Sequence, residues 1–445
     1  VIPLLRSFNW PAVLAPVGSW MLTPSNQPVI FGDEPAPRER FLNAQELRQV
    51  AKSPLVEIGA HTFASHKGSL GNPQGNLMPH MANHQYLPEK QRYETSQEFQ
   101  QRVREDVRAV TRTIVETTGR KPRVWVWPYG RANGEALQVI REEGYELFLT
   151  LEVGLADVQK PDNVPRMLMT GRDNIESIAA LMVDESPTPS LRVTHIDLDY
   201  IYDADPAQQA KNLDMLVQRI ADMKINTVFL QAFSDPDGDG LVKEVYFPNS
   251  VLPMRADFFN RVAWQLASRG GVRVYAWMPV LSLALDDSYP RVSRWNPADG
   301  QVSVDPKQYQ RLSPFNARNR EAISKLYEDL ARHASFAGVL YPDDALLSDF
   351  EDASPDALAA YERAGLPRDI GAIRADAELM QRWTRFKSQA LVRFTQELTD
   401  KVRKIRGPEI KTARNIFAAP ILDPKAEQWF AQNPDDFLKA YDWTA

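Results

Sequence analysis

The spacing of hydrophobic residues along the chain follows two alternating patterns. Apolar runs of about four to eight residues are typical of buried strands, and longer stretches with helical spacing are typical of amphipathic helices. Because strands and helices alternate in the first part of the chain, we expect an α/β domain with a mainly parallel sheet. The predicted strands are 11–17, 56–60, 124–128 and 147–151, and the predicted helices are 42–52, 95–118 and 135–143.

The alternation is more regular in the second part of the chain. Six apolar runs predict strands at 193–198, 227–233, 272–280, 336–341, 410–417 and 441–445, with helices at 206–224, 256–268, 318–333 and 375–405. Pro206 fits the first position of a helix, and Asn43 and Asn316 fit N-caps. Repeated strand–helix units over about 250 residues predict a (β/α)8 TIM-like barrel. Six strands do not close such a barrel, so we expect its C-terminal part to be missing.

The chain length and one Pro-rich segment predict two domains. The 445 residues are too many for one ordinary domain, and the segment 186–190 alternates Ser or Thr with Pro. We therefore expect a first domain at 1–185, a linker at 186–192 and a barrel at 193–445. The chain starts at Val1 without a methionine, so we also expect the N-terminal part of the first domain to be missing.

Composition excludes several classes of function. The hydrophobic and charged fractions, 43% and 25%, are those of a globular protein. The net charge is −6 with no long basic run, so a nucleic-acid partner is not expected. Cysteine is absent, which removes disulfides, thiolate metal sites and cysteine nucleophiles. No apolar run approaches the roughly 18 residues that a membrane span needs.

Two of the six histidines lie on one predicted strand-end loop. His61 and His66 follow the strand 56–60, and two imidazoles at this spacing can reach one divalent ion such as zinc, nickel or cobalt. The alternative is that both only form hydrogen bonds in a polar loop. His80 and His84 lie in a loop rich in Pro, Gly and Asn, where we expect solvent exposure.

A barrel places functional residues at the C-terminal ends of its strands, and polar residues are found there. Asp197 and Asp199 end the first barrel strand, Trp277 lies in the third, and Asp343 and Asp344 end the fourth. The loop 235–240 begins like a calcium loop, but Tyr246 stands where a bidentate glutamate is needed. We therefore interpret this loop as a polar sugar-binding loop.

The adjacent acids Asp343 and Asp344 are the best candidates for catalysis. Neighbouring strand residues point to opposite faces, so one acid should face the barrel mouth while the other supports it. Glycoside cleavage needs a proton donor with a raised pKa, and often a second carboxylate. Asp349 and Glu351 are alternative carboxylates. The sequence does not separate these assignments.

The histidine loop carries a resemblance to a known family. His-Thr-x-x-Ser-His at 61–66 resembles the second motif of the polysaccharide deacetylases (carbohydrate esterase family 4), and 127–130 resembles their third motif. The resemblance implies that His61 and His66 bind a metal, and that Trp127 and Tyr129 line the substrate groove. It also implies an aspartate ligand and an aspartate base in an upstream Thr-Phe-Asp-Asp-Gly motif, which the chain does not contain. Val126 stands where the family has an arginine.

Longer runs carry a wider resemblance. Together with the deacetylase-like part, the segments 195–200, 235–244, 343–349 and 411–417 are similar to the two-domain poly-β-1,6-N-acetyl-D-glucosamine N-deacetylases of Gram-negative biofilm export. The resemblance implies partial deacetylation by the first domain, and binding and endo-hydrolysis of the partly deacetylated polymer by the second. It implies an acidic centre at Asp343 and Asp344.

The same resemblance implies further site residues and a location. Plausible residues of the polymer groove are Trp277, Tyr309 and Trp429, with Lys243 as a further candidate. The location is the periplasm, with a lipid anchor to the outer membrane in the missing N-terminus and a partner in the export machinery. The alternative is a carbohydrate-binding and export module without hydrolytic turnover. A transglycosylase using the same acids is a third possibility.

Overall fold

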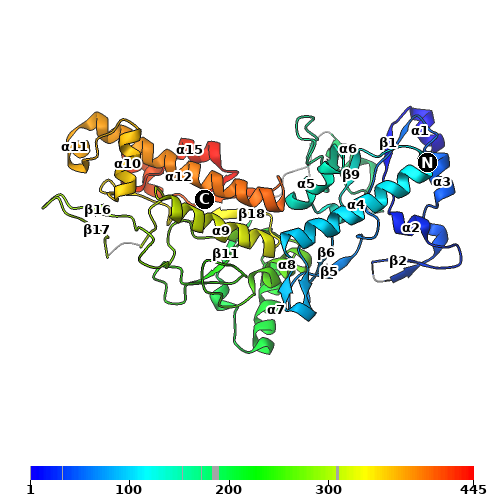
Figure 1. Cartoon of the computed structure of the whole chain (residues 1–445), viewed down its shortest axis with the longest axis horizontal. Helices are drawn as coiled ribbons and strands as arrows, with labels where there is room; N and C mark the ends of the chain where they lie inside the picture. Colours follow the sequence, from blue (N-terminus) through cyan, green and yellow to red (C-terminus); the bar gives the residue numbers. More distant parts are fainter. Residues whose placement is uncertain (1, 33, 153, 172, 183–189, 307–309) are drawn as a thin grey trace. The chain divides into compact units, whose positions relative to one another are not determined.

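The computed structural model describes residues 2–32, 34–152, 154–171, 173–182, 190–306 and 310–445. The chain divides into two units (Figure 1). The first comprises Val1–Ser190 and Lys404–Glu409, and the second comprises Leu191–Arg403 and Ile410–Ala445. Most of the predicted linker, 186–189, lies outside the described residues.

Short parallel strands form the centre of the first unit. Strand β1 (Ala12–Leu14) pairs with β4 (Val56–Ile58), and β9 (Val124–Val126) pairs with β10 (Leu147–Leu149). A bridge between Ala60 and Trp125 connects the two pairs. The four predicted strands and their parallel pairing are confirmed, although each strand is shorter than predicted.

Two helices of the first unit begin at capping boxes. Helix α3 (Ala44–Val50) has the predicted N-cap Asn43, which exchanges hydrogen bonds with Glu46. Helix α4 (Ser96–Thr118) is capped in the same way by Thr95 and Glu98. Its buried residues recur every three or four positions and pack with α5 (Gly134–Glu142) in the core; they are Phe99, Val103, Val107, Val110 and Ile114.

Several short elements of the first unit were not predicted. Strands of two or three residues give no recognisable period, because alternation needs about four residues to be detected. They form three hairpins: β2 (Val29–Phe31) with β3 (Glu34–Ala36), β5 (Gly68–Leu70) with β6 (Leu77–Pro79), and β7 (Tyr86–Leu87) with β8 (Arg92–Tyr93). The short helices α2 (Gly18–Leu22) and α6 (Ile175–Met182) were not predicted either, whereas α1 (Ile2–Phe8) agrees with the helix that the sequence predicts at 1–7.

The second unit contains a six-stranded parallel sheet whose strands pair in chain order. All six predicted strands are present. They are β11 (Val193–Ile196), β12 (Thr227–Gln231), β15 (Arg273–Trp277), β18 (Gly338–Tyr341), β19 (Lys411–Arg414) and β20 (Trp443–Thr444). Sequential parallel order with helical crossovers is the construction of a β/α barrel. The curled sheet forms the half-barrel that the sequence predicted.

The sheet is buried on both faces, as parallel sheets are. Phe229, Tyr275, Leu340 and Ala413 form a cluster on one face, and alternate residues such as Val228, Val274 and Val339 are fully buried on the other. Gly338 is required by this packing. A Cβ there would lie 2.4 Å from the ring of Tyr275 and 2.7 Å from the carbonyl oxygen of Lys411.

The long helices of the second unit also match the predictions. Helices α7 (Pro206–Asp222), α8 (Phe259–Arg269), α9 (Ala317–His333) and α12 (Ala377–Arg406) lie between the strands (Figure 1). Pro206 begins α7, and Asn316 caps α9, as expected. Five helices were missed because they are short: α10 (Pro355–Arg363), α11 (Ile370–Ala375), α13 (Ala418–Leu422), α14 (Glu427–Phe430) and α15 (Pro434–Ala440).

The remaining strands of the second unit form two hairpins in its loops. Strand β13 (Phe233–Ser234) pairs with β14 (Glu244–Val245), and β16 (Arg294–Trp295) pairs with β17 (Val302–Ser303). Both hairpins follow strands of the main sheet at their C-terminal ends. They therefore lie on the side of the sheet where a barrel carries its functional loops.

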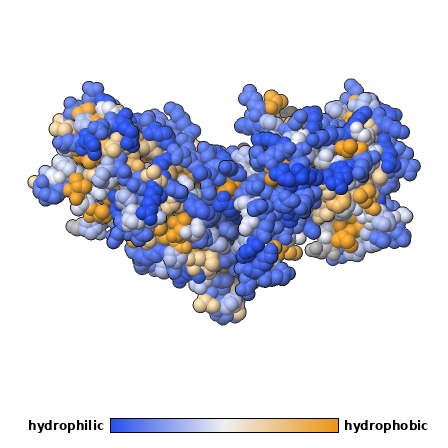
Figure 2. Space-filling model, viewed as in Figure 1, coloured by the Kyte–Doolittle hydropathy of each residue, from blue (hydrophilic) through white to orange (hydrophobic). Residues whose placement is uncertain are grey.

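The surface is mainly hydrophilic on the face shown in Figure 2, with apolar side chains in scattered patches. Among the residues that the structure describes, no helix combines the length and the apolar character needed to cross a membrane.

The predicted solvent exposure of His80 and His84 is wrong. Both side chains are buried, with exposed fractions of 9% and 3%. The polar residues of their loop fold inward. Nδ1 of His84 donates a hydrogen bond to the carbonyl oxygen of Glu94, and its Nε2 lies 2.9 Å from the carboxylate of Glu135. Burial lowers the pKa of His80 to about 3, and the nearby charges of Arg102 and Lys67 act in the same direction.

This pKa gives the first prediction. The unfolded chain binds a proton at His80 near its ordinary pKa of about 6.5, whereas the folded chain does so only near 3. Stability should therefore fall as the pH is lowered from about 6.5 towards 3. In a His80→Gln variant, which keeps a partner for Gln85, this part of the fall should be absent. Hydrogen exchange of the α4 amides, followed as a function of pH, measures this change in stability. An equal pH dependence in both proteins would contradict the assignment.

Candidate functional site

The C-terminal ends of four neighbouring barrel strands meet at one cavity. It has a volume of about 330 Å³ and is lined by Asp197, Asp235, Trp277, Asp343 and Asp344, among others. These residues follow or end β11, β12, β15 and β18. The structure therefore brings together four of the residues that the sequence singled out, from three separate segments. Burial raises the pKa of Asp197 in this cavity.

The carboxylate of Asp344 is an anchor rather than a free group. The side chain is buried, and its Oδ2 atom accepts hydrogen bonds from the backbone N–H groups of Val280, Leu281 and Ser282, at 2.8, 2.7 and 2.9 Å. These three residues follow β15, so the contact ties the end of β18 to the end of its neighbour. Burial raises the pKa of Asp344, although the three amides oppose this shift.

Arg414 holds the same turn from the other side. Its guanidinium, on β19, is buried and donates hydrogen bonds to the carbonyl oxygens of Pro342 and Ala345. The two residues bracket Asp343 and Asp344. The turn is therefore fixed by the carboxylate of Asp344, which belongs to it, and by the guanidinium of Arg414 on the next strand.

Asp343 is left free by this arrangement. It is partly exposed and lines both the small cavity and a larger neighbouring one. Among the described residues it has no hydrogen-bond or ion-pair partner, whereas the other acids of the two cavities each have at least one. Asp343 is thus the acid most available to a ligand.

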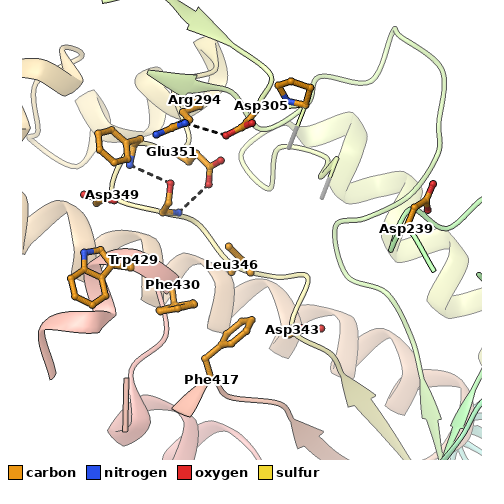
Figure 3. Close-up of a pocket in the computed structure, with 13 residues that line it drawn as sticks. Asp239, Arg294, Asp305, Asp343, Leu346, Asp349, Glu351, Phe417, Trp429 and Phe430 are labelled. Carbon is orange, nitrogen blue, oxygen red and sulfur yellow. Dashed lines mark hydrogen bonds and ion pairs between the residues drawn. The ribbon is translucent and has the colours of Figure 1, made fainter. Parts of the chain in front are cut away.

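The larger cavity has a volume of about 760 Å³ and two chemically different sides (Figure 3). Phe417, Trp429 and Phe430 lie along one side, and Arg294, Asp305 and Glu351 lie opposite them. Trp429 is 49% exposed, so its ring is available for stacking. Such an arrangement suits a sugar chain, because aromatic rings stack on pyranose faces while carboxylates bind hydroxyl or ammonium groups.

Cations fix the acidic side of this cavity. Arg311 forms a buried ion pair with Glu351 at 3.0 Å, and Arg374 binds Asp349 at 2.6 Å. The fully buried Lys387 of α12 donates hydrogen bonds to the carbonyls of Ser348 and Glu351. Burial lowers the pKa of this lysine to about 7. The alternative carboxylates Asp349 and Glu351 are therefore both engaged.

Three other predicted groove residues have different surroundings. Asp199 accepts hydrogen bonds from Ser234, the backbone of Asp235 and the hydroxyl of Tyr246, and it lines neither cavity. Lys243 is exposed and pairs with Asp237 and Asp239, which leaves it committed to its own loop. Tyr309 lies outside the described residues.

The loop 235–240 brings three carboxylates together. Among the described residues, Asp235, Asp237 and Asp239 are the group whose oxygen atoms lie close enough to hold an ion. Two of them already pair with Lys243, and two are exposed. The geometry therefore gives no reason to revise the interpretation of this segment as a polar loop.

In the first unit, His61 and His66 lie side by side with ring centroids 5.0 Å apart. The Nδ1 atom of His61 lies 2.6 Å from the carbonyl oxygen of Val126, which leaves Nε2 free to bind a ligand. Nδ1 of His66 is buried without a hydrogen-bond partner. Burial lowers the pKa of both, that of His61 to about 4, so both are neutral near pH 7. Two neutral imidazoles with unused nitrogens fit a divalent metal.

Tyr129 and Trp127 lie differently from one another. Tyr129 is 41% exposed, and its ring centroid lies 4.5 Å from that of His66. Trp127 is fully buried in the core beside Trp125, so its predicted place in a groove is wrong. The cause is the end of strand β9 at Val126: Trp127 still packs in the core with Trp125, whereas Tyr129 lies in the following 3-10 turn (Pro128–Gly130) with a φ of 56° that turns its side chain outward.

The sequence missed several residues of the cavities. Arg294, Asp305, Phe417 and Phe430 line the large cavity, and Lys387 shapes it from behind. A strand-end signal was available for Phe417, which follows β19. The others come from a loop hairpin, a short helix or the buried face of a long helix, where no local pattern marks them.

The contrast between Asp343 and Asp344 gives the second prediction. Asp344→Ala leaves three backbone N–H groups without their acceptor and should destabilise the second unit by about 3 kcal/mol. Asp343→Ala, the matched control, should change stability by less than about 0.5 kcal/mol because it removes no hydrogen bond. Denaturant unfolding measures both. Similar losses in the two variants would refute the division of roles.

Comparison with known proteins covers both units. Residues 195–445 match the family model described as hypothetical glycosyl hydrolase family 13, and residues 1–148 match that of the polysaccharide deacetylases, a metal-dependent family. The chain is 50% identical over its whole length to the poly-beta-1,6-N-acetyl-D-glucosamine N-deacetylases of Escherichia coli strains K12 and O157:H7. It spans 66% of the length of each.

A solved structure extends the comparison to the barrel. The PgaB (BpsB) glycoside hydrolase domain from Bordetella bronchiseptica is 48% identical, with a TM-score of 0.55. The match covers 58% of this chain and 74% of that one. The chain therefore belongs to the family of hypothetical glycosyl hydrolase family 13, and it carries a polysaccharide deacetylase domain followed by a glycoside hydrolase-like domain.

Proposed function

We propose that the chain serves in the processing of a polymer of β-1,6-linked N-acetylglucosamine in two steps, through domains at 1–185 and 193–445, and that the deacetylase site at 1–185 is incomplete in this chain because the family's aspartate ligand and base lie in an upstream motif. The first domain removes some of the acetyl groups, and the second binds the partly deacetylated polymer and hydrolyses it internally. The observation that carries the second step is the free acid Asp343, placed between an aromatic wall and an acidic wall. The name of the Escherichia coli relatives supports the choice of polymer.

The chemistry of the polymer fits the large cavity. Each deacetylated sugar carries an amine that is protonated near pH 7, and the carboxylates of Asp239, Asp305 and Asp349 can accept a further hydrogen bond from such a group beside the Lys or Arg that each already pairs with. Trp429 and Trp277 offer ring surfaces for the pyranose faces. A fully acetylated polymer lacks the cationic group and gains less from these acids. The second step should therefore prefer the product of the first.

Asp343 is the proposed proton donor to the glycosidic oxygen. Proton transfer needs a carboxyl group within hydrogen-bond reach of the glycosidic oxygen, and Asp343 lines the cavity where this oxygen would lie. Asp344 keeps the turn in place. In the proposed substrate-assisted reaction, the acetamido oxygen of the sugar whose glycosidic bond is cleaved attacks the anomeric carbon of that same sugar, in place of an enzyme nucleophile, as the leaving sugar takes the proton. Asp349 and Glu351 contribute to the shape and the negative charge of the groove.

In the first domain, His61 and His66 are the proposed ligands of a divalent metal, either zinc, nickel or cobalt. A bound ion of this kind supplies an activated water and polarises the amide carbonyl. An aspartate from upstream sequence completes the ligand set in this proposal. The hydrogen bond of His61 to Val126 fixes the orientation of the first ligand, and the ring of Tyr129 covers one side of the second.

The proposed setting is the periplasm, with attachment to the outer membrane through a lipid anchor and contact with an export machinery. This setting follows from the resemblance to the deacetylases of biofilm export. A second function, carbohydrate binding and export without turnover, uses the same aromatic and acidic walls. Cleavage by the barrel distinguishes the two.

The third prediction concerns this distinction. Asp343→Asn should lower the rate of cleavage of partly deacetylated polymer by about 10² to 10⁴, the usual contribution of general acid catalysis, with binding retained. The exposed Asp214→Asn on α7 is a matched control and should cleave normally. Product size after incubation measures cleavage, and calorimetry measures binding. Binding without any cleavage by the unaltered protein would favour the export module, and undiminished cleavage by Asp343→Asn would remove this acid from the mechanism.

The fourth prediction concerns the metal. His61→Ala and His66→Ala should each weaken zinc binding at least about ten-fold, because each removes one of the ligands. His195→Ala, in the other unit, should bind zinc as the unaltered chain does. Titration calorimetry with zinc alone measures the affinity. If both ligand variants bind zinc normally, the ion binds elsewhere.

A further inference from the structure

The loop between the two histidines is held by one carboxylate from another part of the chain. Asp106, on helix α4, accepts four hydrogen bonds from consecutive residues of this loop. They come from the hydroxyl of Thr62 (2.6 Å), the backbone N–H groups of Phe63 (2.8 Å) and Ala64 (2.9 Å), and the hydroxyl of Ser65 (2.6 Å). His61 and His66 stand immediately on either side of these four residues.

The contact is closed, and its two hydroxyl donors are buried. The side chain of Thr62 is fully buried, and that of Ser65 is 3% exposed. The hydroxyl of Thr62 also accepts a hydrogen bond from the backbone N–H of Ser65 at 2.9 Å, which closes the loop on itself. Hydrogen bonds to an ionised carboxylate are stronger than those between neutral groups, so four of them on one side chain fix the loop conformation.

Asp106 itself is on a rigid support. Its neighbours on the buried side of α4, Val103, Val107 and Val110, are fully buried in the core of the first unit. The side-chain contacts of Asp106 therefore attach the loop to α4 and its core, in addition to the backbone hydrogen bonds that Gly18 and Ser19 donate to the carbonyl oxygens of Thr62 and Phe63. No polar contact within the described residues fixes the Nδ1 atom of His66, so the path of the loop matters most for this ring.

We propose that Asp106 is a positioning residue of the His61–His66 site. It sets the separation and orientation of the two imidazoles by holding the loop between them, and it does not touch metal or substrate. The proposal deepens the function proposed for the first domain, and its effect on the histidine rings can be measured without a metal. Since ligand geometry must be held within about 0.5 Å, loss of this contact should weaken ion binding.

The test compares Asp106→Ala and the milder Asp106→Asn with Glu105→Gln, an exposed acid on the same helix. In the full chain without added metal, amide hydrogen exchange at Phe63 and Ala64 should rise at least ten-fold in Asp106→Ala and less in Asp106→Asn. Exchange of the α4 core amides should not change, which shows that the unit is folded. The Nδ1–H nitrogen resonance of His61, bonded to Val126, should broaden in the same order.

Zinc titration completes the test. Zinc affinity should fall about ten-fold in Asp106→Ala and partly recover in Asp106→Asn, with Glu105→Gln unaffected. Normal loop protection in Asp106→Ala, or a loosened loop with sharp His61 resonance and unchanged zinc affinity, would overturn the proposal. If the unaltered chain binds no zinc, the proposed metal function fails, while the exchange and resonance data still decide the role of Asp106.

Discussion

The second unit depends on the hydrogen bonds between one buried carboxylate and three consecutive backbone amides. Asp344 accepts from Val280, Leu281 and Ser282, and so joins the ends of two neighbouring barrel strands. Burying a charge is unfavourable unless hydrogen bonds compensate it, and here three amides do. The partner residue Asp343 is consequently held at the edge of the sheet with its own carboxylate unoccupied. Binding and structure are thus divided between two adjacent acids.

In the first unit, too, one carboxylate fixes a loop by accepting several hydrogen bonds from it. Asp106 holds the histidine loop through four donors, as Asp344 holds the loop after β15 through three. In both places an acid from a well-packed element fixes a loop, and the loop or its neighbour presents the groups available to a ligand. Lys387 acts similarly on the carbonyls that flank Asp349 and Glu351. These charged side chains therefore fix the positions of loops, and the more exposed charged side chains remain available to a ligand.

Periodicity and capping chemistry were sufficient to predict the barrel. The six strands, the first residue of α7 and the caps of α3 and α9 agree with the sequence, because each depends on neighbours within a few positions. The gathering of Asp197, Trp277, Asp343 and Asp344 followed from strand order alone. Contacts between residues far apart in the sequence leave no comparable pattern along the chain. Neither the pairing of Arg414 with the turn nor that of Asp106 with the histidine loop can be read from local spacing.

The errors have the same origin. His80 and His84 lie in a polar loop that folds inward. His84 finds a partner in Glu135, which is far away in the sequence, and His80 finds one in Gln85 of the same loop. Trp127 belongs to a motif associated with a groove, yet it packs in the core beside Trp125, and only Tyr129 in the following turn is exposed. Polar composition therefore does not establish exposure, and a motif does not establish which of its side chains faces the ligand.

The central claim is that Asp343 is the free acid at the centre of a polymer groove. A crystal structure of the chain with a short, partly deacetylated β-1,6-linked oligosaccharide tests it most directly. The account predicts a sugar within hydrogen-bond distance of the Asp343 carboxylate, an adjacent pyranose stacked on Trp429, and Asp344 still bound to its three amides. An oligosaccharide bound away from both cavities, or reaching Asp344 instead of Asp343, would contradict it.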